Sequence, residues 1–177
     1  TLNQYVKTCN IKQLSFCCLI NTHDMGNTRS KIYHLLNKID NIACPGKLFN
    51  NVSNIELNKI GKHNYIKQFI FNICPENFDT NNIPGYNTEK LWDCCFGGAI
   101  PIYAGYFDDI DEKIFNRKRI IFYNTKDKNS VERVYSTVKK LFDDKDKLNE
   151  FYKQPIFNDN TYETIKKLKS DLFTIFK

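Results

Sequence analysis

Apolar residues in this chain gather into short continuous runs, separated by longer stretches that are either polar or helix-periodic. The runs are rich in β-branched and aromatic side chains, which is typical of strands buried in a sheet. An uninterrupted apolar run also fits a parallel sheet that is covered on both faces. We therefore predict strands at residues 14–20, 69–74, 99–103 and 119–123.

Between these runs, apolar residues recur at the three-to-four-residue spacing of amphipathic helices. Helices are predicted at residues 29–39, 55–61, 89–96, 130–141, 148–152 and 162–176, a turn at 43–47 and an acidic, solvated loop at 105–115. Strands that alternate with helices in this way predict an α/β fold, with a Rossmann-like parallel sheet flanked by helices.

A long polar loop follows the predicted strand at 69–74. Pro75 ends that strand, and residues 76–88 show no hydrophobic period before Thr88 caps the next helix. Long loops inside compact domains are usually functional or disordered, and open α/β sheets bind ligands at the carboxyl ends of their strands. The helix start offers N–H groups and a positive dipole end, and Lys90 adds a charge, so this point suits an anion such as phosphate.

Arg29 stands at the start of another predicted helix, directly after the polar loop at 21–28. A cation is disfavoured at this end of a helix, because the helix dipole is positive there. Two interpretations follow: Arg29 is held in place for a ligand anion, or it is an exposed arginine without a partner.

Three blocks in register make the chain resemble a known family. Pro75-Glu76-Asn77-Phe78, then Gly85-Tyr86-Asn87-Thr88-Glu89-Lys90-Leu91-Trp92, then Gly98-Ala99-Ile100-Pro101-Ile102-Tyr103, resemble the donor-binding signature of the α-1,3/α-1,4-fucosyltransferases. The resemblance implies that residues 14–177 form the carboxy-terminal, donor-binding half of a GT-B glycosyltransferase of family 10. It also implies that residues 1–13 are a linker or the end of a preceding segment, and that the acceptor domain is absent from this chain.

The resemblance also implies roles for individual residues. Arg29, Lys90, Asn77 and the helix start at Thr88 would hold the diphosphate of guanosine diphosphate-fucose, whose charge grows as it departs. Glu89 would bind the ribose hydroxyls, and Tyr86 the nucleoside. Glu76 matches the pattern too, and its alternative role is that of a loop carboxylate accepting backbone N–H bonds. No metal or other cofactor is expected, because the resembled family holds its diphosphate with protein groups.

The chain departs from the family pattern after Tyr103. The family has Trp-Gly-x-Pro next, whereas this chain has Ala104-Gly105-Tyr106-Phe107. That segment borders the sugar, so a sugar other than fucose is an alternative. The catalytic base for inverting transfer to a glycan acceptor is expected in the absent amino-terminal half, and no residue here is assigned that role.

The composition of the chain indicates which classes of binding partner and which compartment to expect. The formal charge of +6 is dispersed along the chain. Dispersed basic residues favour an ordinary solvated surface, so we expect no nucleic-acid partner. The seven cysteines show no Cys-x-x-Cys pair, and Cys17-Cys18 and Cys94-Cys95 lie in apolar runs, so free buried thiols are expected. Free thiols favour the cytoplasm, and the Golgi lumen is the alternative if the full-length protein carries an anchor. A non-catalytic module of the same fold that binds a glycan or protein partner remains the alternative function.

Overall fold

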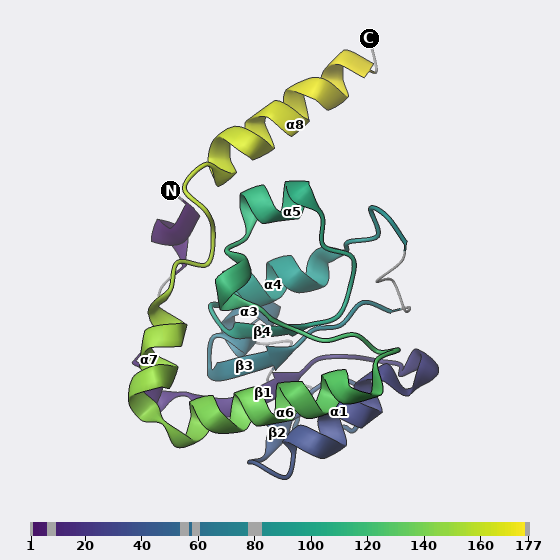
Figure 1. Ribbon diagram of the computed structural model, residues 1–177, viewed down its shortest axis with the longest axis vertical. Helices are drawn as coiled ribbons and strands as arrows, with labels where there is room; N and C mark the ends of the chain where they lie inside the picture. Colours follow the sequence, from purple (N-terminus) through teal and green to yellow (C-terminus); the bar gives the residue numbers. More distant parts are fainter. Residues whose placement is uncertain (1, 7–9, 54–56, 58–60, 78–82, 176–177) are drawn as a thin grey trace.

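The computed structural model describes residues 2–6, 10–53, 57, 61–77 and 83–175. Its centre is a five-stranded parallel sheet in the order β2-β1-β3-β4-β5 (Figure 1). The strands are β1 (Ser15–Leu19), β2 (Ile42–Ala43), β3 (Phe69–Ile73), β4 (Ile100–Tyr103) and β5 (Ile121–Phe122). The predicted parallel α/β fold is confirmed.

Helices cover both faces of the sheet (Figure 1). One face is covered by α1 (Thr28–Leu36), α6 (Lys128–Asp143) and α7 (Lys145–Lys153), and the other by α3 (Lys62–Ile66), α4 (Glu89–Gly97) and α5 (Asp109–Ile114). The last helix, α8 (Thr161–Ile175), extends away from the body of the domain. Short 3₁₀ turns lie at Leu2–Tyr5, Ile11–Gln13, Met25–Asn27 and Arg117–Arg119.

Each helical layer encloses its own part of the hydrophobic core. Under α1 and α6 the core contains Phe71, Ile102 and Ile121 from the sheet. Under α3, α4 and α5 it contains Leu91, Phe115 and Phe157, together with the half-buried Trp92, whose ring lies 4.7 Å from that of Phe115. The strands are therefore buried on both sides, which explains why their sequences are continuous apolar runs.

Two elements correct the expectations from the sequence. The predicted acidic loop at 105–115 contains α5, because Asp108 and Asp111 form a capping box and acidic residues in a first turn favour the helix dipole. The predicted turn at 43–47 begins inside the edge strand β2, which has only two residues and so leaves no apolar run to recognise.

Helices also differ from the prediction in their boundaries. The helix predicted from Ser130 begins at Lys128, capped by Asp127, while the Ser130 hydroxyl accepts a bond from the Asn124 N–H. Helix α1 ends at Leu36, and α3 was not predicted. The helix predicted at 55–61 falls almost wholly outside the described residues.

The start of the chain packs against the segment between α7 and α8. The Asn3 side-chain carbonyl accepts bonds from the Ile156 and Phe157 N–H groups, and its amide donates to the Phe157 carbonyl at 2.7 Å. Val6 is buried. The division of the sequence at residues 13 and 14 stays a prediction. Within the described parts of the chain, no helix is both long and apolar enough to cross a membrane.

Candidate functional site

The strand order places a topological switch point between β1 and β3. From these neighbouring strands the chain proceeds in opposite directions, with α1 on one face of the sheet and α4 on the other. Ligands of open α/β sheets bind in the crevice that this arrangement leaves at the carboxyl ends of the strands. A narrow crevice lies here, lined by Asn21 after β1, Cys74 after β3 and Lys90 of α4, among others.

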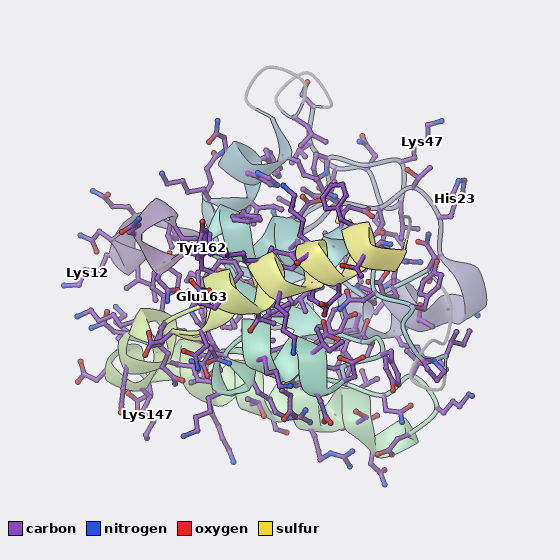
Figure 2. All side chains as sticks on the ribbon, turned by 90° about the horizontal axis from the view of Figure 1, so that it is seen from above. Lys12, His23, Lys47, Lys147, Tyr162 and Glu163 are labelled. Atoms are coloured by element: carbon purple, nitrogen blue, oxygen red, sulfur yellow. The ribbon has the colours of Figure 1, made fainter. Side chains whose placement is uncertain are left out.

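The loop after β2 closes one side of this edge. Its Leu48 N–H donates to the Asn21 carbonyl at 3.0 Å, and Figure 2 shows Lys47 and His23 at the periphery of the molecule. Gly46 permits the contact, because a Cβ there would lie 2.3 Å from the Asn21 carbonyl oxygen. The loops after β1 and β2 are thereby held together.

Arg29 is buried at the same edge and ties α1 to the end of β3. Its Nη1 donates to the His23 carbonyl at 3.0 Å, and its Nη2 to the carbonyls of Pro75 at 3.2 Å and Glu76 at 3.0 Å. Nη2 also lies 3.1 Å from the Asn77 side-chain oxygen. The alternative of an exposed, unpartnered arginine is wrong, because Arg29 is only 1% exposed.

Charge compensation at Arg29 is incomplete. Among the described residues its guanidinium contacts only neutral oxygens and forms no ion pair. Burial lowers the pKa of Arg29, while the neighbouring Tyr123, Asp24 and Glu76 act in the opposite direction. A buried cation without a carboxylate partner attracts an anionic ligand.

Asp24 caps helix α1 beside Arg29. Its carboxylate accepts from the backbone N–H of Arg29 and of Ser30, each at 2.9 Å, and from the Ser30 hydroxyl. Burial raises the pKa of Asp24, but these hydrogen bonds outweigh burial and hold the pKa below its ordinary value. An acid with a lowered pKa stabilises the fold above its unfolded pKa, and that contribution is lost as the pH falls through the folded pKa.

Replacing Asp24 with asparagine should therefore give a pH-dependent loss. At pH 7 we expect a decrease of about 1 kcal/mol in the free energy of unfolding, the usual value of a helix cap. The difference should shrink as the pH falls below the unfolded pKa of about 4 and vanish once the pH is below the lowered folded pKa, because the wild type is then protonated too. Urea unfolding at pH 7, 5 and 3 measures this, and a difference that stays constant over all three pH values would contradict the assignment.

Glu76 is the hub of a second set of contacts. Its buried carboxylate accepts from the Thr88 N–H at 3.0 Å and the Thr88 hydroxyl at 2.5 Å, and it pairs with Lys90 at 3.2 Å. The Tyr103 hydroxyl lies 3.4 Å away. Burial and the Glu76 carboxylate raise the pKa of Tyr103, so its hydroxyl keeps its proton.

Gly105 lies so close to Tyr103 and Glu76 that no side chain fits at this position. A Cβ at Gly105 would lie 2.2 Å from the Tyr103 hydroxyl and 2.9 Å from the Glu76 Cγ. Asn87 extends the network, since its amide donates to Asp111 of α5 at 2.8 Å. Two of the helices on this face, α4 and α5, thus meet the end of β4 through Glu76, Tyr103 and Asn87.

The remaining predicted site residues lie along the same loop. Thr88 occupies the cap position of α4, but its hydroxyl donates to Glu76 and makes no capping bond to the helix. Glu89 is exposed in the first turn, and Tyr86 is half-buried. Asn77 is exposed and gives its oxygen to Arg29, which leaves its amide without an acceptor among the residues described.

Hydrogen bonds and ion pairs thus join most of the predicted residues. Arg29 links to Asn77 and to the Glu76 backbone, and the Glu76 side chain links to Thr88 and Lys90. Sequence reasoning missed Asp24, Asn87, Tyr103 and Gly105. Only Gly105 gave a signal, as a glycine directly after a strand, where the backbone often makes a close approach. In the described residues there is no group of three or more side chains that could hold a metal ion.

Comparison with known proteins now identifies the family. Residues 9–169 match the family model for "Glycosyltransferase family 10 (fucosyltransferase) C-term". The chain belongs to glycosyltransferase family 10. The resemblance inferred from the three sequence blocks is therefore confirmed.

Relatives of this family 10 chain include an α-(1,3)-fucosyltransferase FucT of Helicobacter pylori. It is 29% identical over 142 residues, which cover 80% of this chain and 28% of the relative. Two solved α1,3-fucosyltransferase structures, one of them with GDP-fucose, match with TM-scores of 0.67 and 0.65 at 23% identity. Each match covers 92% of this chain and 46% or 48% of the solved chain, so the family 10 chain spans less than half the length of these relatives.

Proposed function

We propose that this chain is the donor-binding part of a fucosyltransferase-like enzyme, and that it holds guanosine diphosphate-fucose or a related nucleotide sugar. Transfer would proceed with inversion to a glycan acceptor. The observation that carries the proposal is Arg29, a buried guanidinium with no ion-pair partner in the described structure, at the carboxyl edge beside the switch point. Support also comes from the H. pylori relative, which is named as a fucosyltransferase, and from a solved relative with GDP-fucose.

The diphosphate requires several donors that converge on one place. As the glycosidic bond breaks, negative charge grows on the departing diphosphate, and fixed positive groups lower the barrier. We assign this task to Arg29, the Asn77 amide, Lys90 and the start of α4 at Thr88. Lys90 is pinned by Glu76 at 3.2 Å, which holds its charge at the crevice.

The remaining assignments follow from exposure and chemistry. Glu89 is exposed at the start of α4, where a carboxylate can accept from two ribose hydroxyls, and Tyr86 can pack on the nucleoside. The contacts of Glu76 favour its alternative role, because the carboxylate is occupied by Thr88 and Lys90. We therefore assign Glu76 the task of positioning these two residues.

The whole enzyme would include parts beyond this chain. We propose an amino-terminal acceptor domain that supplies the catalytic base and binds the glycan, with no metal ion in the reaction. All six described cysteines are free and buried, which supports a reducing compartment such as the cytoplasm, with the Golgi lumen as the alternative. The segment Ala104-Gly105-Tyr106-Phe107, which departs from the family pattern, keeps a sugar other than fucose as the second candidate.

Calorimetric titration of the purified chain tests the proposal. We expect guanosine diphosphate to bind more tightly than uridine diphosphate, and Lys90→Ala to weaken binding about tenfold or more, since a charged hydrogen bond is worth about 1.5 to 3 kcal/mol. Lys139→Ala is the matched control, because Lys139 is an exposed lysine on α6 that pairs with Asp143. Equal binding of both nucleotides, or loss of binding in neither lysine variant, would refute the donor assignment.

A further inference from the structure

Four buried polar side-chain atoms have no hydrogen-bond partner in the described structure, and two of them belong to neighbouring residues near the carboxyl edge. They are the hydroxyl of Tyr123, a residue 4% exposed, and the Nε of Arg29, a residue 1% exposed. Most buried polar groups in native proteins are paired, so each exception asks for an explanation. Tyr123 follows β5 and was predicted only as part of a strand.

The register of the sheet brings Tyr123 to the region of Arg29. Phe122 pairs with Tyr103, and the Tyr123 N–H donates to the Tyr103 carbonyl at 2.9 Å, so Tyr123 lies beside Ala104. Ala104 in turn follows β4 next to the end of β3, since its carbonyl accepts from the Glu76 N–H at 2.8 Å. Ala104 and Tyr123 belong to the core cluster under α1, the helix that carries Arg29.

Electrostatics agrees with this placement. Burial lowers the pKa of Arg29, and Tyr123 is the foremost of the neighbours that act against this effect. Burial also raises the pKa of Tyr123, with a smaller contribution from Cys74 in the same direction and an opposing one from Arg29. The phenol therefore stays protonated at physiological pH and remains available as a hydrogen-bond donor.

Both unpartnered atoms are hydrogen-bond donors, so the same kind of ligand would satisfy them. An arginine Nε can only donate, and a protonated phenol donates as well. The nearby acceptors are engaged: the carbonyls of His23, Pro75 and Glu76 bind the other arginine nitrogens, and the Asp24 carboxylate caps α1. What would satisfy both donors is an oxygen that brings unused lone pairs and negative charge, such as a phosphoryl oxygen.

Access to this end of the sheet exists beside Tyr123. A groove of about 340 Å³ runs past the carboxyl ends of β4 and β5, lined by Gly105, Tyr106, Phe107, Arg117, Phe122, Tyr123, Asn124 and Ser130. Of these residues, Phe107 departs from the family pattern, which has Pro at that position. The groove therefore reaches Tyr123 from outside the sheet.

We propose that Tyr123 is a further ligand-binding residue, whose hydroxyl joins the Nε of Arg29 in binding one oxygen of a diphosphate group. This inference rests on the proposed function for the nature of the ligand. It adds a residue that no sequence block contains, and it gives the edge of the sheet a second neutral donor beside the Asn77 amide. Because the phenol is neutral, it would bind the diphosphate without the energetic cost of keeping a second charge buried in the empty site.

Tyr123→Phe tests the inference with inorganic pyrophosphate and guanosine diphosphate as the calorimetric probes. We expect affinity for both to fall about tenfold or more, the usual worth of a hydrogen bond to a charged group. Without ligand, the melting temperature should stay the same or rise, because the substitution removes an unsatisfied buried hydroxyl. A merely structural tyrosine would not combine weaker binding with unchanged or higher stability.

Tyr152→Phe is the matched control. Tyr152 is equally buried in the same core cluster, but its ring lies under the guanidinium of Arg119, a residue that precedes β5. Affinities within about twofold of the wild type in Tyr123→Phe, or an equal loss in Tyr152→Phe, would overturn the inference while the proposed function stands. If guanosine and uridine diphosphates bind alike and Tyr123→Phe weakens both, the inference stands and guanosine selectivity fails. A wild-type chain that binds neither pyrophosphate nor nucleotide overturns both.

Discussion

Replacing Glu76 with alanine is expected to lower the free energy of unfolding by about 3 to 5 kcal/mol, the range for breaking a buried ion pair from one side. The substitution would leave Lys90 without its carboxylate and the Thr88 N–H without its acceptor. Both partners are shielded, because the Glu76 side chain is 0% exposed and that of Lys90 is 12% exposed. Urea unfolding followed by circular dichroism measures the loss.

Two controls separate the hub from a general effect of removing a carboxylate. Glu89→Ala removes an exposed acid from the same loop and helix, and should change stability by no more than about 0.5 kcal/mol. In the double variant Glu76→Ala/Lys90→Met the stranded cation is gone, so part of the loss should be recovered. If Glu76→Ala is as stable as Glu89→Ala, the carboxylate does not organise the start of α4.

Arg29→Ala should have the next largest effect, and it should act on both stability and binding. Three backbone carbonyls, those of His23, Pro75 and Glu76, would lose their donor. Buried acceptors left unsatisfied cost about 1 to 3 kcal/mol each, so we expect a loss of about 3 kcal/mol or more. Affinity for guanosine diphosphate should fall about 100-fold, within the range for truncating one partner of a buried charge pair.

Binding to Arg29→Ala is to be measured at low temperature, where circular dichroism shows the variant to be folded. Arg133→Ala is the control, because Arg133 is an exposed arginine on α6 whose ion pair with Asp127 is worth at most about 1 kcal/mol. A folded Arg29→Ala variant that binds guanosine diphosphate like the wild type would show that this arginine serves the fold alone. Loss of affinity in Arg133→Ala would point to long-range charge instead of a specific site.

The sheet was predictable where burial on two faces leaves a continuous apolar run. β1, β3 and β4 were found to within a residue at each end for this reason. β5 is shorter than expected, because Arg119 belongs to a 3₁₀ turn and its guanidinium reaches the Gly98 and Gln154 carbonyls. The acidic stretch that forms α5 was read as a loop, because capping carboxylates look the same in a sequence as solvated ones.

Only those residues of the candidate site that belong to a sequence motif, or that stand at an unusual position in a helix, were predictable from the sequence. The blocks that resemble the family supplied Asn77, Lys90 and the residues between, and dipole reasoning drew attention to Arg29. Contacts made across the sheet leave no such trace: Tyr103 and Tyr123 look like ordinary strand residues in the sequence, and Glu76 meets the Tyr103 hydroxyl only after β3 and β4 are paired in register. Distances in space therefore decided which carboxylate organises the loop.

Because the described cysteines are buried, the rate at which each one reacts reports local opening of the folded chain. Cys17 and Cys18 lie in β1, Cys94 and Cys95 in α4, and Cys44 and Cys74 follow β2 and β3, all enclosed by the core. Burial raises the pKa of Cys44 to about 12, so little thiolate is present to react while the packing around it is closed. An alkylating reagent will therefore mark each of these thiols at the rate at which its own layer separates from the sheet, and mass spectrometry can time the two helical layers independently.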